Sequence, residues 1–212
     1  MRTRLFLVLL MVTIVTRNAR SQDYFLIDQQ SGDESSRLEI GRLLDMGLPQ
    51  AQSFTPAFAS IDFVRLKLTV LGGDLSPPAS VDVCLWSVWS GRPDGRPLAV
   101  SELEEIPKGW HRYVVFRFQN SVPLRPETTY FIEVRQRSDL YSPQPALYWH
   151  GDFRLQYPRG MAWNGSTPVP GLDFWFQEGI VVPEPTTAAL LLVGLGTLGA
   201  GRWFWHKGRR GA

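Results

Sequence analysis

Cysteine and histidine are scarce in this chain, and their scarcity excludes two kinds of site. Cys84 is the only cysteine, so the chain cannot form an intramolecular disulfide. It lies in an apolar run, which predicts a buried structural thiol. The three histidines, His111, His150 and His206, are far apart and have no His-x-x-x-His or paired-cysteine spacing around them. Zinc chemistry therefore has no support, and we expect no metal or other cofactor.

Sequence signatures of catalysis are also missing. No Gly-x-Ser-x-Gly segment occurs, and no histidine has a recognisable catalytic partner. A glycosidase needs two carboxylates that face each other across a bond, and the spacing of the later acidic residues singles out no such pair. These residues are Asp139, Asp152, Asp173 and Glu178. We therefore expect a protein that is not an enzyme, with a glycan hydrolase as the least favoured alternative.

Positive charge is lacking from the central part of the chain, although the whole chain has a formal net charge of +2. Four Lys/Arg residues lie in the first 21 positions and four follow Val182, which leaves 14 Lys/Arg against 19 Asp/Glu between them. The central part therefore carries about −5. A nucleic-acid-binding surface needs a concentrated basic face, so we expect no nucleic-acid partner.

Long apolar runs occur at the two ends of the chain. Near the N-terminus, two arginines precede an apolar run from Leu5 to Val15 that is too short for a comfortable membrane span. Small residues at Ala19 and Ser21 suit a cut before Gln22. This pattern predicts a secretory signal peptide over residues 1–21, and an uncleaved N-terminal anchor is the alternative. Either one exports the residues that follow.

The C-terminal end has three parts in a fixed order. Pro183, Glu184 and Pro185 come first, and an apolar run from Thr186 to Gly201 follows. The chain then ends on a basic cluster made of Arg202, Lys207, Arg209 and Arg210. The run is slightly shorter than the roughly 20 residues that cross a bilayer as a helix, but the aromatic residues after it suit a membrane interface. Positive charge after the span places that end in the cytoplasm and everything before it outside.

The two prolines give this end a segment that a protease can reach. Pro183 and Pro185 cannot continue a helix from upstream, so they leave the chain extended where the span emerges. The whole layout closely resembles the PEP-CTERM sorting signal of Gram-negative bacteria. The resemblance implies an exosortase-type membrane protease as a partner, a transient stay in the inner membrane, and delivery to the cell surface or extracellular matrix. An ordinary single-pass anchor is the alternative, but it does not explain Pro-Glu-Pro.

Residues 22–182 form one predicted domain between the signal peptide and a sorting tail over residues 183–212. Hydrophobic residues in this domain alternate with period two, and turn residues recur about every ten positions, which is typical of an all-β sandwich. Alternation is clearest at Val64, Leu66, Leu68 and Val70. The run from Val81 to Trp89 is apolar on both faces and predicts a central strand.

We expect eight or nine strands in all. The remaining ones lie near residues 24–28, 98–104, 110–118, 130–136, 146–150 and 173–180, and residues 38–46 are ambiguous between a helical turn and a short strand. An eight-stranded jelly roll is the natural architecture for this pattern. The predicted fold class is therefore all-β, a jelly-roll-like antiparallel β-sandwich, with an N-terminal signal peptide and a single C-terminal transmembrane helix.

Four short segments of the domain have a family resemblance of their own. They are residues 52–56, 124–130, 157–160 and 172–176. Together they resemble a recurrent exported β-sandwich module of bacterial surface proteins, which is similar in layout to carbohydrate-binding jelly rolls. The resemblance implies the fold far more than an activity, and no assigned reaction comes with it.

Aromatic residues carry the remaining functional hypothesis. Six tryptophans remain when the two in the tail are set aside, and most of them lie in predicted strands as core or cross-strand residues. Trp149, Tyr157 and Trp163 instead flank a Gly/Pro-rich segment that we expect to form loops at one end of the sandwich. Exposed rings there would stack on sugar faces. The alternative function is therefore a carbohydrate-binding adhesion module that acts on extracellular polysaccharide.

Overall fold

The computed structural model describes residues 23–32, 40–44, 48–72, 76–91, 95–137, 144–154 and 157–183. The chain divides into two compact units, and the one called the body here is Phe25–Val181. Among the described residues, no helix is long and apolar enough to span a membrane. The predicted signal peptide, the predicted transmembrane segment, Glu184, Pro185 and the basic cluster all lie outside them.

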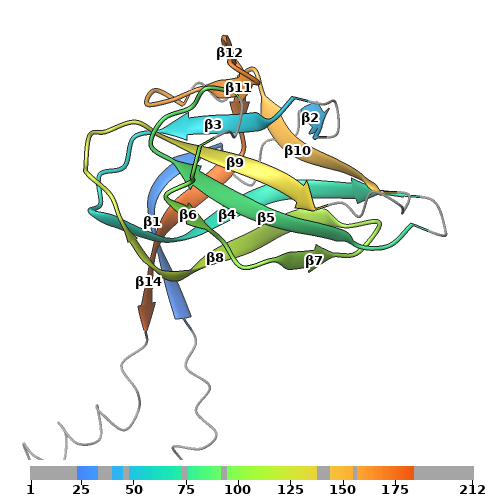
Figure 1. Cartoon of the computed structure of the whole chain (residues 1–212), viewed down its shortest axis with the longest axis horizontal. Coiled ribbons are helices and arrows are strands. Elements are labelled where there is room, and N and C mark those ends of the chain that lie inside the picture. The colour runs from blue at the N-terminus through green and yellow to red at the C-terminus, as the bar shows by residue number, and fades with distance from the viewer. Residues whose placement is uncertain are drawn as a thin grey trace, which may run out of the picture. The chain divides into compact units, whose positions relative to one another are not determined.

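Fourteen strands are described, and they form two antiparallel sheets (Figure 1). Sheet A contains β1 (Asp23–Ser31), β2 (Ile40–Leu43), β4 (Ser60–Leu71), β8 (His111–Pro123), β10 (Ala146–Asp152), β13 (Asp173–Phe174) and β14 (Phe176–Pro183). Sheet B contains β3 (Gln50–Phe54), β5 (Ala79–Trp86), β6 (Ala99–Val100), β7 (Glu104–Ile106), β9 (Tyr130–Arg137), β11 (Ala162–Asn164) and β12 (Thr167–Val169). This arrangement confirms an all-β antiparallel sandwich.

Strand β4 shows why the alternating sequence folds this way. Its buried side chains Val64, Leu66 and Leu68 line the core, while Arg65 and Lys67 between them are partly exposed. Directly opposite residues of an antiparallel pair point to the same face, so β8 places Phe116 and Val114 beside Val64 and Leu66. Burial of these alternating side chains specifies the register, because a slip of one residue would expose them all.

Strand β5 is the predicted central strand, with one difference at its end. It pairs with β9 along one edge and with β6 and β7 along the other, and nearly all of its side chains are buried. Cys84 is fully buried as expected, and burial raises the pKa of its thiol to about 12. The strand ends at Trp86 rather than Trp89, so Trp89 lies in the loop that follows.

Short strands explain why the structure has more strands than the eight or nine that the sequence predicts. Six of the fourteen, β2, β6, β7, β11, β12 and β13, have two to four residues each. Such strands contain too few positions to show an alternating pattern. The ambiguous segment at 38–46 contains the strand β2, which pairs with β10. The predicted strand at 98–104 is interrupted, and Ser101 forms an isolated bridge to Phe118 between β6 and β7.

Candidate functional site

The predicted sorting tail begins at Pro183, which is the last residue of β14. This strand lies between β4 and β1 in sheet A. The ladder with β4 is antiparallel and runs from the pair Phe176 and Leu66 to the pair Gly179 and Phe63. Val181, two residues further along, donates its backbone N–H to Asp62 Oδ2 at 2.8 Å. The last strand of the body is therefore tied to β4 up to two residues before Pro183.

Strand β1 lies along the other side of β14. Gln177 Nε2 donates to Gln30 Oε1 at 3.0 Å, and Gly179 lies against the backbone of Leu26 and Asp28. Residue numbers rise along one strand as they fall along the other, so the two strands run in opposite directions. Figure 1 shows them side by side. The chain thus enters the body along β1 and leaves it along β14 as neighbours.

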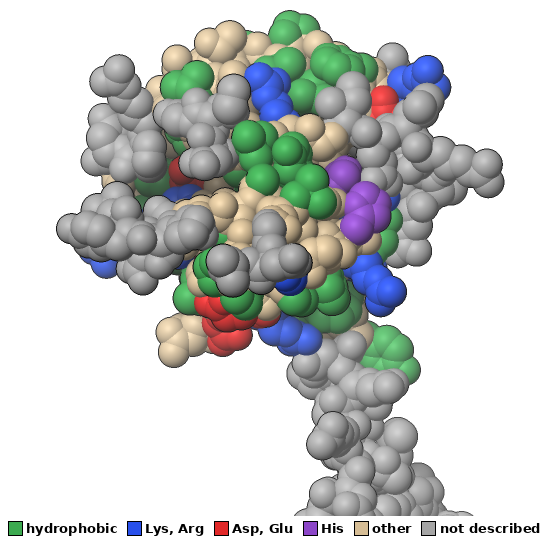
Figure 2. Space-filling model, turned by 90° about the vertical axis from the view of Figure 1, so that its right-hand side faces the viewer, with side chains coloured by type: hydrophobic (Ala, Val, Ile, Leu, Met, Phe, Trp, Pro, Cys, Tyr) green, Lys and Arg blue, Asp and Glu red, His purple; other side chains and the backbone are tan. Residues whose placement is uncertain are grey.

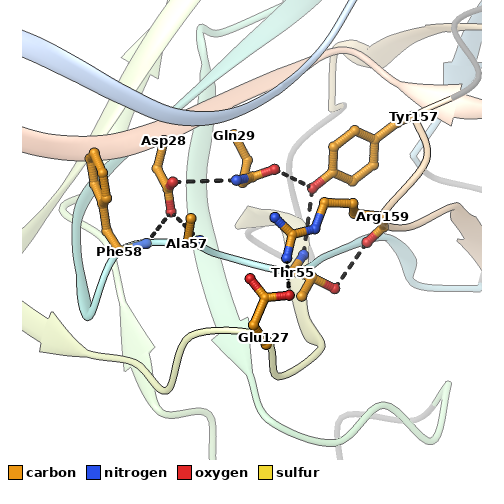
Figure 3. A network of polar contacts seen from close by, with 8 residues as sticks. All are labelled: Asp28, Gln29, Thr55, Ala57, Phe58, Glu127, Tyr157 and Arg159. Atoms are coloured by element: carbon orange, nitrogen blue, oxygen red, sulfur yellow. Dashed lines mark hydrogen bonds and ion pairs between the residues drawn. The ribbon is translucent and has the colours of Figure 1, made fainter.

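A network of polar contacts connects β1 to the loops around it (Figure 3). Asp28 Oδ2 accepts hydrogen bonds from the backbone N–H groups of Ala57 and Phe58 at 2.8 and 2.7 Å. Gln29 Oε1 accepts a hydrogen bond from the Tyr157 hydroxyl at 3.0 Å. These contacts fix the first strand of the body to a loop between β3 and β4 and to the residues that precede β11.

The same network includes an ion pair at the surface. Arg159 Nη2 donates to the Glu127 carboxylate, and Thr55 Oγ1 donates to the Arg159 carbonyl oxygen at 3.1 Å. Glu127 has a φ of 59°, which is the left-handed region that side chains other than glycine seldom adopt. Two of the four segments with a family resemblance, 124–130 and 157–160, are therefore joined by a structural contact.

Glu178 is a buried acid beside this network. Its side chain has 0% exposure, and neither carboxyl oxygen has a hydrogen-bond partner of good geometry within the described part of the chain. Burial, together with the nearby carboxyl of Asp28, raises the pKa of its carboxyl to about 9. At neutral pH, Glu178 is therefore protonated and carries no charge.

The other acidic candidates that the structure describes have structural partners. Asp173 accepts hydrogen bonds from Tyr157 N at 2.7 Å and from Gln52 Nε2 at 3.1 Å. Asp152 Oδ1 accepts one from Arg154 N at 2.9 Å. Asp139 lies outside the described residues. Within the described ranges, no group of three or more His, Cys, Asp and Glu side chains is placed to hold a metal ion.

Two of the three predicted sugar-stacking rings are buried, which corrects the prediction for them. Trp149 has 0% exposure because its position on β10 faces the core opposite Leu68. Its ring stacks on Phe174 at 4.3 Å, and its Nε1 donates to the Trp175 carbonyl oxygen. Tyr157 is 7% exposed and points into the network of Figure 3. Neither ring can stack on a sugar, so only Trp163 remains of the three.

Trp163 belongs to an aromatic cluster on the outer face of sheet B. Phe131 on β9 stacks with Trp89 at 6.2 Å and meets Trp163 edge-on at 5.7 Å between ring centroids. All three side chains are half-buried. Trp89 Nε1 donates to the Gly165 carbonyl oxygen at 2.8 Å, which holds its loop against the β11–β12 hairpin. We call Trp89, Phe131 and Trp163 the aromatic cluster.

Sequence reasoning missed two members of this cluster for identifiable reasons. Trp89 was expected inside a strand, whereas it follows the end of β5. Phe131 lies between Tyr130 and Ile132, whose side chains are buried in the core, and a neighbour of core residues on a strand points to the opposite face. That alternation is the signal by which Phe131 could have been found.

Two histidines that are distant in the sequence meet on the outer face of sheet A. Thr69 Oγ1 lies 2.5 Å from His111 Nδ1 and 2.6 Å from His150 Nε2. Figure 2 shows the histidine side chains next to each other at the surface. Burial lowers the pKa of His150 to about 4, and the positive charges of His111 and Lys67 contribute. His150 is therefore neutral at physiological pH.

The comparison with known families concerns the end of β14 and the tail. Residues 181–210 match the family model of the PEP-CTERM protein-sorting motif. No curated protein matches this chain. The chain thus carries a PEP-CTERM sorting motif where the sequence predicts one. The motif implies export in a Gram-negative bacterium, processing by the membrane protease exosortase, and placement at the cell surface or outside the cell.

Proposed function

We propose that this protein is a non-catalytic β-sandwich that is exported, held briefly in the inner membrane by its tail, and displayed at the cell surface or in the extracellular matrix after processing. The observation that carries the proposal is the sorting-motif match at residues 181–210, which begins within the last strand of the sandwich. In this proposal, residues 1–21 act as a signal peptide. The apolar run after Pro185 acts as a single transmembrane helix, and the basic cluster holds its end in the cytoplasm.

A jelly-roll layout of the body belongs to the same proposal. Two antiparallel sheets with the first and last long strands as neighbours support it. In such a body both chain ends leave from one ladder, so removing the tail takes no core residue away. Processing would therefore leave the sandwich intact.

The test of this proposal is to change Pro183, Glu184 and Pro185 to alanine together. We expect full-length protein to accumulate in the inner membrane, because the protease has lost its recognition segment. Membrane fractionation and mass spectrometry of the surface and extracellular fractions measure the result. Alanine at the exposed Pro77 and Pro78 is the matched control, since it removes two prolines away from the tail. Release of the triple variant at the wild-type level would show that the sorting interpretation is wrong.

Carbohydrate-binding adhesion is a second candidate function, and the aromatic cluster is the observation that favours it. Three half-buried rings from β9, β11 and the loop after β5 gather on one sheet face. Aromatic rings present apolar faces on which sugar rings can pack. The proposed ligand is the polysaccharide of the organism's own extracellular matrix.

Replacing Trp89 and Trp163 by alanine tests this candidate. We expect the variant to lose retention on the matrix polysaccharide while its unfolding transition stays cooperative. Phe153→Ala is the control, because Phe153 is an exposed aromatic residue outside the cluster. Equal retention of the double variant and the wild type would rule out the adhesion function and leave the proposal of a non-catalytic displayed β-sandwich.

A further inference from the structure

On its β4 side, strand β14 pairs first with backbone groups of β4 and then, at Asp62, with a side chain. The ladder between the two backbones extends to the pair Gly179 and Phe63. β4 is irregular between Ile61 and Phe63, where its pairing with β8 shifts register. At this irregularity a side chain accepts the next hydrogen bond, because Val181 N donates to Asp62 Oδ2 at 2.8 Å. Oδ1 of the same carboxylate is buried and has no hydrogen-bond partner within the described ranges.

Prolines occupy the next two positions that would face β4. Successive backbone N–H groups along a strand point to alternate edges, so an N–H at position 183, or at position 185 if the strand continued, would point toward β4 as that of Val181 does. Both are proline and have no N–H to donate. Backbone N–H groups of β14 therefore cannot continue to donate hydrogen bonds toward β4 in the Pro-Glu-Pro segment. The contact with Asp62 is where it ends.

The segment left for a protease is short. Four residues, 182–185, separate Val181 from the apolar run that begins at Thr186. Fully extended, four residues span at most about 14 Å. The length of chain that the protease can reach therefore depends strongly on whether the end of β14 is held against β4 or released. Val182 is already 42% exposed.

We propose that Asp62 is a positioning residue for processing, because its carboxylate holds Val181 and so sets where the extended segment leaves the body. This inference rests on the proposed function, since it assumes that processing occurs in or next to Pro183–Pro185. Loss of the contact lengthens the extended segment by releasing the end of β14. The tail is then processed faster.

Hydrogen exchange on the full-length protein gives a readout that needs no protease. The protein is made in cells that lack exosortase and is solubilised in mild detergent. Asp62→Ala is expected to speed amide exchange at Val181 by roughly tenfold, the effect of losing one hydrogen bond, with little change at Phe176–Gly179. Val181→Pro removes the donor and leaves Asp62 in place. Because proline has no amide hydrogen, exchange in this variant is read at the neighbouring Val182, and the variant keeps the test valid if Asp62→Ala does not fold. Asp62→Asn keeps an acceptor oxygen and should stay near the wild type.

Pulse-chase labelling in cells that contain exosortase gives the second readout. Tail removal is expected to be several-fold faster for Asp62→Ala and Val181→Pro than for the wild type, and unchanged for Glu102→Ala, which removes an exposed carboxylate elsewhere. Unchanged exchange at Val181 would overturn the inference. Faster exchange with unchanged processing would also overturn it, because Asp62 would then have only a structural role. Normal processing of the triple alanine variant would instead contradict the proposed function itself, whatever the exchange data show.

Discussion

Glu178 shows how a single side chain can set the pH dependence of this fold. It lies opposite Val64 on the face that points into the sandwich. Burial and the neighbouring Asp28 raise its pKa from 4.5 to about 9. Between these two values the folded protein keeps a proton that the unfolded chain releases. Stability therefore falls as pH rises through this window, by at most about 1.4 kcal/mol per pH unit for one group.

We predict that Glu178→Gln removes this pH dependence. Glutamine has nearly the same shape and carries no charge at any pH, so the folded state no longer depends on retaining a proton. At pH 8 the variant is expected to be more stable than the wild type by about 1–3 kcal/mol, with a smaller difference at pH 5. Urea denaturation at pH 5, 6.5 and 8 measures this. Parallel curves of stability against pH for the two proteins would contradict the prediction.

Residue placement also shows where sequence reasoning ends. Trp149 and Trp163 both flank the same Gly/Pro-rich segment, yet one is fully buried and the other is half-exposed. The difference comes from register, because Trp149 pairs with Leu68 and Trp163 pairs with Ala51 on the other sheet. Register between strands 80 or more residues apart is not encoded in local spacing. The contact of Thr69 with two histidines depends on the same non-local pairing.

Among the elements, β14 depends on a position without a side chain. A Cβ at Gly179 would lie 2.0 Å from the Leu26 carbonyl oxygen, and that oxygen belongs to the backbone of β1. Only a residue without a Cβ lets the first strand approach the last one so closely. The pairing of β1 with β14 therefore requires glycine at this position.

We predict that Gly179→Ala lowers the free energy of unfolding by about 2–4 kcal/mol, because the clash displaces β1 from β14. Gly95→Ala is the matched control, since a Cβ there would meet only the Trp86 side chain at an ordinary 3.6 Å. Guanidinium denaturation of both variants measures the difference. Equal stability of the two variants would mean that β1 can shift without cost.

Elements with clear alternation were predictable and the short ones were not. β4 was found from sequence because its alternation extends over 12 residues, and β5 was found because its 8 residues belong to a run that is apolar on both faces. The sorting motif was found because its order of prolines, apolar run and basic residues is local. β6 and β7 pair with the edge of β5, β11 pairs with β3, and β12 pairs with β11, so the information that forms them lies outside their own residues. The change of partner at Asp62 depends on an irregularity in β4 that no local sequence signal marks.

For the whole molecule, net charge would distinguish the precursor from the products of the two proposed cuts. The complete chain has a formal charge of +2 and a pI of about 8.8. Residues 1–21 contain four basic residues and no acidic residue, so their removal gives −2. The tail from Pro183 holds four more basic residues and one acidic residue, and its removal gives about −5.

We predict three species in isoelectric focusing of a processing time course, a basic precursor followed by two increasingly acidic products. Mass spectrometry of each band identifies the residues that were lost. Alanine at Pro183 and Pro185 changes no charge, and it is expected to stop the series at the intermediate. A single band that remains basic in cells with exosortase would contradict both cuts.

The position of β14 between two other strands also determines how the body bears a pull. If the tail holds the protein in the membrane as proposed, a load on the body passes through Val181 into β14. A strand that is pulled along its own length and bonded on both edges must break its ladder bonds together rather than one after another. The order β1, β14, β4 thus makes β14 resistant to shear, so a pull on the tail would not peel this strand from the body one hydrogen bond at a time.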